Sequence, residues 1–148
     1  MVKDLINKLA NYHDFSIEGN IEKFEEVLSE LASTKNPEII PWLLTFFDDG
    51  CDFPEVMFSI IHTIEIFDDA KYVEKLLVAL PEIWKRSPYW VKVLHFRILN
   101  SKETMEEYAK QISKINADLK EVVREVISKI GNDSPKFKER CDLILSQI

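Results

Sequence analysis

Glycine is scarce in this sequence, with only 3 residues among 148. Phosphate-binding loops and tight hairpin turns both depend on glycine, so its scarcity argues against both and favours helices. The two cysteines, Cys51 and Cys141, are far apart and belong to no Cys-x-x-Cys pair. Both are therefore expected to be free thiols in a reducing compartment.

Long apolar runs and targeting signals are also missing. The most apolar segment, residues 56–67, is interrupted by Ser59, His62 and Glu65, and it is shorter than the ~20 residues of a membrane span. The chain starts with an amphipathic segment rather than with the apolar core of a signal peptide. We therefore expect a cytoplasmic protein that does not contact a membrane.

Patterns for metal binding or catalysis are absent as well. The three histidines, His13, His62 and His95, have no second ligand at His-x-x-x-His or Glu-x-x-His spacing, and no Gly-x-Ser-x-Gly elbow is present. His62 lies in an apolar helical segment and is predicted to be a hydrogen-bonded core residue, and His95 resembles it. We expect no catalytic residue, no metal and no cofactor. An enzyme whose site assembles only in three dimensions remains an alternative.

What the chain does have is the composition of a folded globular protein. Hydrophobic residues make up 46% of it and charged residues 30%, which excludes disorder. Its length of 148 residues is near the commonest size of one domain. The sequence therefore predicts a single domain over residues 1–148 with one continuous core.

Apolar residues recur at helical spacing in nearly every segment. Asn36, Ser87 and Ser134 each stand directly before a proline, which is the pattern of a helix cap followed by a first-turn residue. Gly131 is predicted to end a helix. The sequence predicts an all-α fold with about nine helices, at residues 2–13, 20–34, 37–47, 54–67, 70–79, 88–99, 102–115, 117–130 and 135–147, and a short turn at residues 81–85.

The order of these segments predicts how the helices pair. After the first helix, the expected pairs are residues 20–34 with 37–47, 54–67 with 70–79, 88–99 with 102–115, and 117–130 with 135–147. The pairs begin about 30 residues apart, a typical period for helical repeats. This period predicts antiparallel pairs in a short right-handed, HEAT-like α-solenoid, in which each pair buries its apolar face on its neighbours. An irregular helical bundle is the alternative.

Charge is divided unevenly along the chain. Residues 1–70 hold 15 acidic and 4 basic side chains, a net charge of -11, whereas residues 71–148 hold 11 acidic and 15 basic ones, a net charge of +4. Such an acidic half attracts a basic protein partner and repels nucleic acid. Solubility alone is the simpler explanation. We expect no nucleic-acid binding.

Two acidic residues stand where the helix dipole disfavours them. Asp48 and Asp49 follow the helix predicted at residues 37–47, at its negative end. Departures of this kind often mark functional sites. Asp52 and Asp69, in contrast, are predicted to cap the helices at 54–67 and 70–79. In a stack of helix pairs, the turns at residues 14–18 and 48–52 share one edge, and Asp68 lies at the opposite edge.

Six aromatic residues of the first half follow helical spacing and are predicted to belong chiefly to the core. Phe53 is the expected exception, because it stands at a helix start beside acidic residues. The six are Trp42, Phe46, Phe47, Phe53, Phe58 and Phe67.

One segment of the second half resembles a known family. It reads Ile83-Trp84-x-x-Ser87-Pro88-x-Trp90-x-x-x-Leu94-His95-x-x-Ile98-Leu99-Asn100-Ser101. This segment is similar to one in the small all-helical immunity proteins of bacterial polymorphic-toxin and contact-dependent growth-inhibition systems, and the resemblance is strongest over residues 80–130. In physical terms it describes a capped helix start, with Trp90, Leu94 and Ile98 on one buried face.

The resemblance implies a cytoplasmic protein that binds one cognate toxin domain and blocks it, often by covering the toxin's active site. Toxins of these systems are frequently nucleases with cationic clefts, and the acidic first half suits such a target. We therefore expect a non-enzymatic inhibitor that occludes the toxin with an acidic edge. An α-helical adaptor for protein–protein interactions is the alternative. The expected binding residues are Asp14, Glu18, Asp48, Asp49, Asp52 and Phe53.

Overall fold

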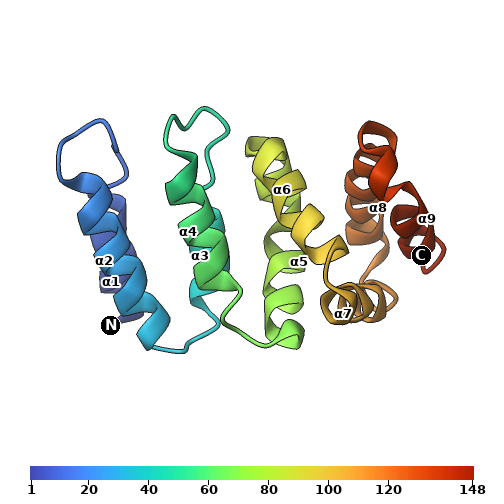
Figure 1. Cartoon of the computed structure of the whole chain (residues 1–148). Helices are drawn as coiled ribbons and strands as arrows, with labels where there is room; N and C mark the ends of the chain where they lie inside the picture. The colour runs from blue at the N-terminus through green and yellow to red at the C-terminus, as the bar shows by residue number, and fades with distance from the viewer.

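The computed structural model describes residues 1–148 and contains nine α-helices and no strand (Figure 1). The predicted all-α fold is confirmed. The helices are α1 (Val2–Ala10), α2 (Asn20–Ser33), α3 (Ile39–Leu44), α4 (Pro54–Ile64), α5 (Asp69–Arg86), α6 (Pro88–Leu99), α7 (Lys102–Ile112), α8 (Ala117–Asp133) and α9 (Lys138–Leu145), with a short 3-10 helix η1 (Pro135–Phe137) before the last. None of them combines the length and the apolar character that a membrane crossing requires.

The first six helices form three hairpins in two layers. The hairpins are α1 with α2, α3 with α4, and α5 with α6. In Figure 1, α2, α4 and α6 lie in front of α1, α3 and α5. The chain then turns through α7, which packs on α5 and α6, and ends with the α8–α9 hairpin.

The predicted pairing of α2 with α3 and of α4 with α5 is wrong, because α1 packs against α2 and shifts the order of the pairs by one helix. Ile6 and Leu9 of α1 are buried, so α1 supplies the first half of the first hairpin. Each of the next two hairpins therefore begins one helix earlier than expected. The pairing of α8 with α9 agrees with the prediction, and so does the contact between α6 and α7.

Helix α5 runs without a break through Pro81, so the predicted helix end at residue 79 and the turn at 81–85 are wrong. A proline inside a helix removes one hydrogen bond and costs ~3 kcal/mol. Continuing the helix, however, places Leu80 and Ile83 in the core, where they are 0% and 2% exposed. Burial of the second half of α5 offsets the cost of the proline.

Gly131 does not end a helix either, since α8 continues to Asp133. A Cβ atom on Gly131 would lie 3.1 Å from the Cβ atom of Cys141 in α9. The glycine therefore permits the close approach of α9 to α8.

Thirty-six buried apolar residues form one continuous core. Trp90, Leu94 and Ile98 belong to it, as predicted for the buried face of α6. His95 is fully buried, and its ring nitrogens lie 2.8 Å from the Val91 carbonyl and 2.9 Å from the Tyr108 hydroxyl, so this core histidine is confirmed.

Three predicted core side chains are not buried. His62 is exposed and lies beside Phe58, so its predicted place in the core is wrong. Trp42 is 51% exposed and Phe58 is 36% exposed. Helical periodicity does not distinguish the buried side of α3 and α4 from the partly exposed side that carries Trp42, Phe58 and His62. Phe46, Phe47 and Phe67 do pack in or against the core, as expected.

Candidate functional site

Two hairpin loops lie at the same edge of the molecule. Residues 11–19 join α1 to α2, and residues 45–53 join α3 to α4. Both loops lie at the top of Figure 1, whereas the connection from α4 to α5, with Asp68, lies at the bottom. We call the six residues predicted for partner binding the acidic edge: Asp14, Glu18, Asp48, Asp49, Asp52 and Phe53.

A hollow of about 470 Å³ separates the two loops. Asp14, Asp48 and Asp52 all line it, together with Phe53. Its apolar part comes from aromatic rings, since the Phe53 and Phe15 rings pack edge to face with centroids 6.4 Å apart. The hollow thus combines three carboxylates with an aromatic surface.

Local hydrogen bonds hold two of these carboxylates while leaving an oxygen of each free. Asp14 Oδ1 accepts hydrogen bonds from the Ser16 hydroxyl at 2.6 Å and the Ser16 amide at 3.1 Å. These bonds lower the pKa of Asp14 below its ordinary value, so it is ionised at neutral pH. Asp48 Oδ1 accepts a hydrogen bond from the Gly50 amide at 2.9 Å. The Oδ2 atoms of both residues accept none from the protein.

Asp49 has a structural role rather than a place in the hollow. Its carboxylate accepts hydrogen bonds from the amides of Tyr89 and Trp90, at 3.0 and 3.3 Å, in the first turn of α6. Asp49 follows the negative end of α3 in sequence but lies at the positive end of α6 in space, where a carboxylate is stabilising. This contact explains the position that the helix dipole of α3 disfavours.

The same loop is tied to the junction between α5 and α6 by two further hydrogen bonds. The buried Ser87 hydroxyl donates to the Phe47 carbonyl at 2.7 Å, and the Arg86 guanidinium donates to the Thr45 carbonyl at 2.6 Å. Ser87 precedes α6 but its side chain does not cap the helix, because Asp49 takes that role. Contacts with the junction between α5 and α6 therefore hold the first part of the loop of residues 45–53 in place.

Asp52 and Asp69 do not cap helices, so both predictions are wrong. The residue before α4 is Phe53, and no side chain caps this helix. Asp52 makes no hydrogen bond to the protein and remains exposed at the hollow. Asp68 caps α5 by accepting a hydrogen bond from the Lys71 amide at 2.9 Å, which places Asp69 one residue inside the helix.

The remaining members of the acidic edge differ in exposure. Glu18 is exposed but does not line the hollow. Phe53 is half-buried against Phe15 rather than fully exposed. Sequence reasoning missed His13 and Phe15, which line the hollow from the first loop. Both residues are neighbours of Asp14 in the same loop, and this position is the feature of the sequence that could have indicated them.

The site presents carboxylate acceptors and aromatic rings. No group of three or more His, Cys, Asp or Glu side chains is placed to hold a metal ion. Burial raises the pKa of the Cys51 thiol, which lines the hollow, so this thiol is protonated at neutral pH. Together, the fold and the site define an all-helical protein that presents an acidic surface at one edge.

The comparison with protein families identifies the family of this chain. The family model described as Immunity protein 30 matches residues 11–108, about two thirds of the chain. This chain belongs to that immunity protein family. The match includes both loops of the acidic edge and begins well before residues 80–130, where the sequence resemblance is strongest. Searches of curated proteins and of solved structures found no match.

Proposed function

We propose that this protein binds a cognate toxin domain and neutralises it by placing the acidic edge in the toxin's basic active-site cleft. A nuclease is the toxin class that suits this surface, because its cleft binds phosphates and the carboxylates would occupy the positions of phosphate oxygens. The membership of an immunity protein family supports the toxin as partner. The negative charge of the acidic edge supports a basic cleft as the surface that it binds.

The observation that carries the proposal is the meeting of Asp14, Asp48 and Asp52 around one hollow. They come from two loops more than 30 residues apart in sequence, and they keep free carboxylate oxygens. Three carboxylates close together give a strong local field, which the net charge of -11 on residues 1–70 reinforces.

The anchoring of the second loop favours tight binding. Asp49, Ser87 and Arg86 hold residues 45–49 in place in the free protein. A surface that is ordered before it binds loses less conformational entropy on association. Phe53, half-buried at the rim of the hollow, offers an apolar contact next to the charges, as binding hot spots often do.

A triple substitution tests the proposal. The edge variant carries Asp14→Asn, Asp48→Asn and Asp52→Asn. Asn keeps an acceptor oxygen for Ser16 and Gly50, so the fold is expected to change little. Asp49 is left intact because it caps α6. We expect affinity for the cognate toxin domain to fall by about 2 kcal/mol or more in total.

The control variant removes the same charge elsewhere, through Glu106→Gln, Glu125→Gln and Glu139→Gln. These three side chains are exposed and make no ion pair or hydrogen bond. Affinity is measured by calorimetry for both variants. Binding by the edge variant at wild-type strength would refute the proposal, as would an equal loss in both variants.

A further inference from the structure

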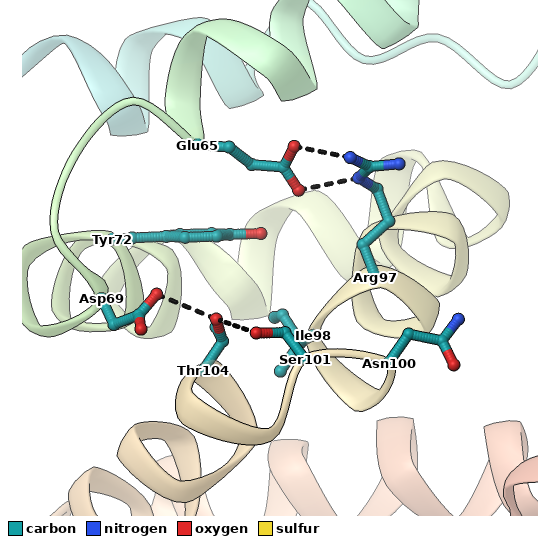
Figure 2. Close-up of a pocket in the computed structure, with 8 residues that line it drawn as sticks. All are labelled: Glu65, Asp69, Tyr72, Arg97, Ile98, Asn100, Ser101 and Thr104. Carbon is teal, nitrogen blue, oxygen red and sulfur yellow. Dashed lines mark hydrogen bonds and ion pairs between the residues drawn. The ribbon is translucent and has the colours of Figure 1, made fainter.

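A second hollow, of about 370 Å³, lies at the opposite edge of the molecule (Figure 2). It is formed where α4 ends, α5 begins, α6 ends and α7 begins. Unlike the hollow at the acidic edge, its lining is mainly polar and includes Glu65, Asp69, Tyr72, Arg97 and Thr104.

The Tyr72 hydroxyl in this hollow has no hydrogen-bond partner. Every other buried side-chain nitrogen or oxygen atom has a hydrogen-bond partner, and Tyr72 is only 3% exposed. Figure 2 shows the hydroxyl pointing into the space between the Glu65–Arg97 pair and Thr104. An unpaired buried hydroxyl destabilises a fold, so its presence beside an open hollow indicates a missing partner group. Burial raises the pKa of Tyr72, and the nearby Glu65 carboxylate raises it further. Tyr72 therefore stays a neutral phenol.

The hydrogen bonds around Tyr72 show which partner group the hollow lacks. Glu65 accepts two hydrogen bonds from Arg97, at 2.7 and 2.8 Å, which neutralises that guanidinium. Asp69 Oδ1 accepts a hydrogen bond from the Thr104 hydroxyl at 2.9 Å, while Asp69 Oδ2 accepts none. With two carboxylates and one guanidinium, the hollow carries a net negative charge, and Asp69 Oδ2 and the Tyr72 oxygen are free acceptors.

We propose that this hollow receives a basic side chain, a lysine ammonium or an arginine guanidinium, of the toxin. Such a group donates to the unpaired Tyr72 oxygen and balances the net charge that the Asp69 carboxylate leaves in the hollow. The inference rests on the proposed function, because it takes the toxin as the partner. It adds a second contact, separate from the acidic edge.

One toxin domain can reach both sites. Glu55, Phe58, His62 and Glu65 recur on one side of α4, and this stripe runs from the acidic edge to the second hollow. Eleven residues of α4 span only about 16 Å. An interface of ordinary size covers about 800 Å² on each partner and is roughly 30 Å across. Phe58, at 36% exposed, lies between the two sites and adds apolar area to such an interface.

Two single substitutions test the inference. Tyr72→Phe removes only the hydroxyl, and Asp69→Asn removes the charge while keeping an acceptor for Thr104. Asp118→Asn, an exposed residue of α8, is the matched control. We expect each of the two test substitutions to weaken toxin binding at least fivefold and the control to leave it unchanged. Tyr72→Phe should at the same time leave the melting temperature unchanged or raise it, because the lost hydroxyl had no partner.

Small probes identify the chemistry of the occupant. Nα-acetyl-arginine amide, titrated into the isotope-labelled protein, is expected to shift the amide signals of Ser101 and Thr104 to saturation. The neutral, isosteric Nα-acetyl-citrulline amide is expected not to do so. Equal shifts with both probes would contradict a cation site, and a clear drop in the melting temperature of Tyr72→Phe would show that the hydroxyl is already paired.

The outcomes separate this inference from the proposed function. If the edge variant loses toxin binding while Tyr72→Phe and Asp69→Asn bind as the wild type does, the second contact is refuted and the acidic edge stands. If instead Tyr72→Phe and Asp69→Asn lose toxin binding while the edge variant binds as the wild type does, the acidic edge is refuted and the second contact stands. Saturable binding of the arginine probe without any effect on toxin binding would assign the hollow to another source of basic groups and overturn the inference.

Discussion

Individual carboxylates of the acidic edge have different tasks, although they look alike in sequence. Asp49 stabilises the first turn of α6, whereas Asp52, three residues on, makes no hydrogen bond to the protein. The adjacent Asp48 lines the hollow and has a free oxygen. Within five residues, the loop thus holds one structural carboxylate and two that are available to a partner.

This division predicts opposite effects of two alanine substitutions. Asp49→Ala should lower the free energy of unfolding by about 1 kcal/mol, because it removes the cap of α6. Asp52→Ala should change the free energy of unfolding by less than about 0.5 kcal/mol, as expected of an exposed residue, and should weaken toxin binding. Urea unfolding and calorimetry measure the two effects. Equal stability losses would contradict the assignment of the cap.

His95 predicts a pH dependence of stability. Burial lowers the pKa of His95 to about 4 in the folded protein, from 6.5 in the unfolded chain. The unfolded chain therefore binds a proton more readily between pH 6.5 and pH 4, and the stability that is present above pH 6.5 is lost as the pH falls through this window. The loss amounts to about 3 kcal/mol.

The contribution of His95 is isolated by comparing how steeply the free energy of unfolding changes with pH in the wild type and in a His95 variant. In His95→Gln, the free energy of unfolding should depend less steeply on pH between 6.5 and 4 than in the wild type, whatever its absolute value. Urea titrations at several pH values provide both slopes. Parallel curves would mean that His95 does not contribute to the acid sensitivity.

At the scale of helices, the sequence predicts the fold class well and the packing less well. Periodicity and helix starts place all nine helices, because both are local signals. The predictions fail where distant residues decide, as for the proline of α5, which is tolerated because Leu80 and Ile83 reach the core. Gly131 likewise serves the approach of Cys141 from the next helix rather than a helix end.

The candidate site shows the same limit. That the loops of Asp14 and Asp48 lie at one edge follows from the alternation of helices, so their proximity was predictable. The role of Asp49 was not, because its partners Tyr89 and Trp90 are 40 and 41 residues away in sequence. The sequence also does not predict the hollow at Tyr72, because its lining residues come from four separate elements.

The buried face of α6 predicts a large stability effect. Trp90 is 3% exposed and packs against Phe47 and Phe58, with ring centroids 6.2 and 5.2 Å away. Trp90→Ala should therefore lower the free energy of unfolding by about 3–5 kcal/mol. Chemical denaturation measures this loss. A variant that unfolds like the wild type but no longer binds the toxin would instead make Trp90 an interface residue.

At the scale of the whole molecule, the asymmetry of charge predicts how association responds to salt. Residues 1–70 carry a net charge of -11, and exposed charges are screened beyond about 8 Å at physiological ionic strength. Lowering the salt concentration should therefore raise the association rate constant with the toxin about tenfold or more, with a smaller effect on dissociation. Stopped-flow mixing at several salt concentrations measures both rates, and a rate independent of salt would contradict electrostatic steering.

If the toxin covers the acidic edge, the backbone amides of its two loops lose access to solvent in the complex, and hydrogen exchange measures this loss. Amide exchange is compared in the free protein and in the complex with the toxin domain, by mass spectrometry of peptides. We expect slower exchange in the complex for residues 11–19 and 45–53, the two loops that surround Asp14, Asp48 and Asp52. Unchanged exchange in both loops, with protection confined to α7 and α9, would contradict it.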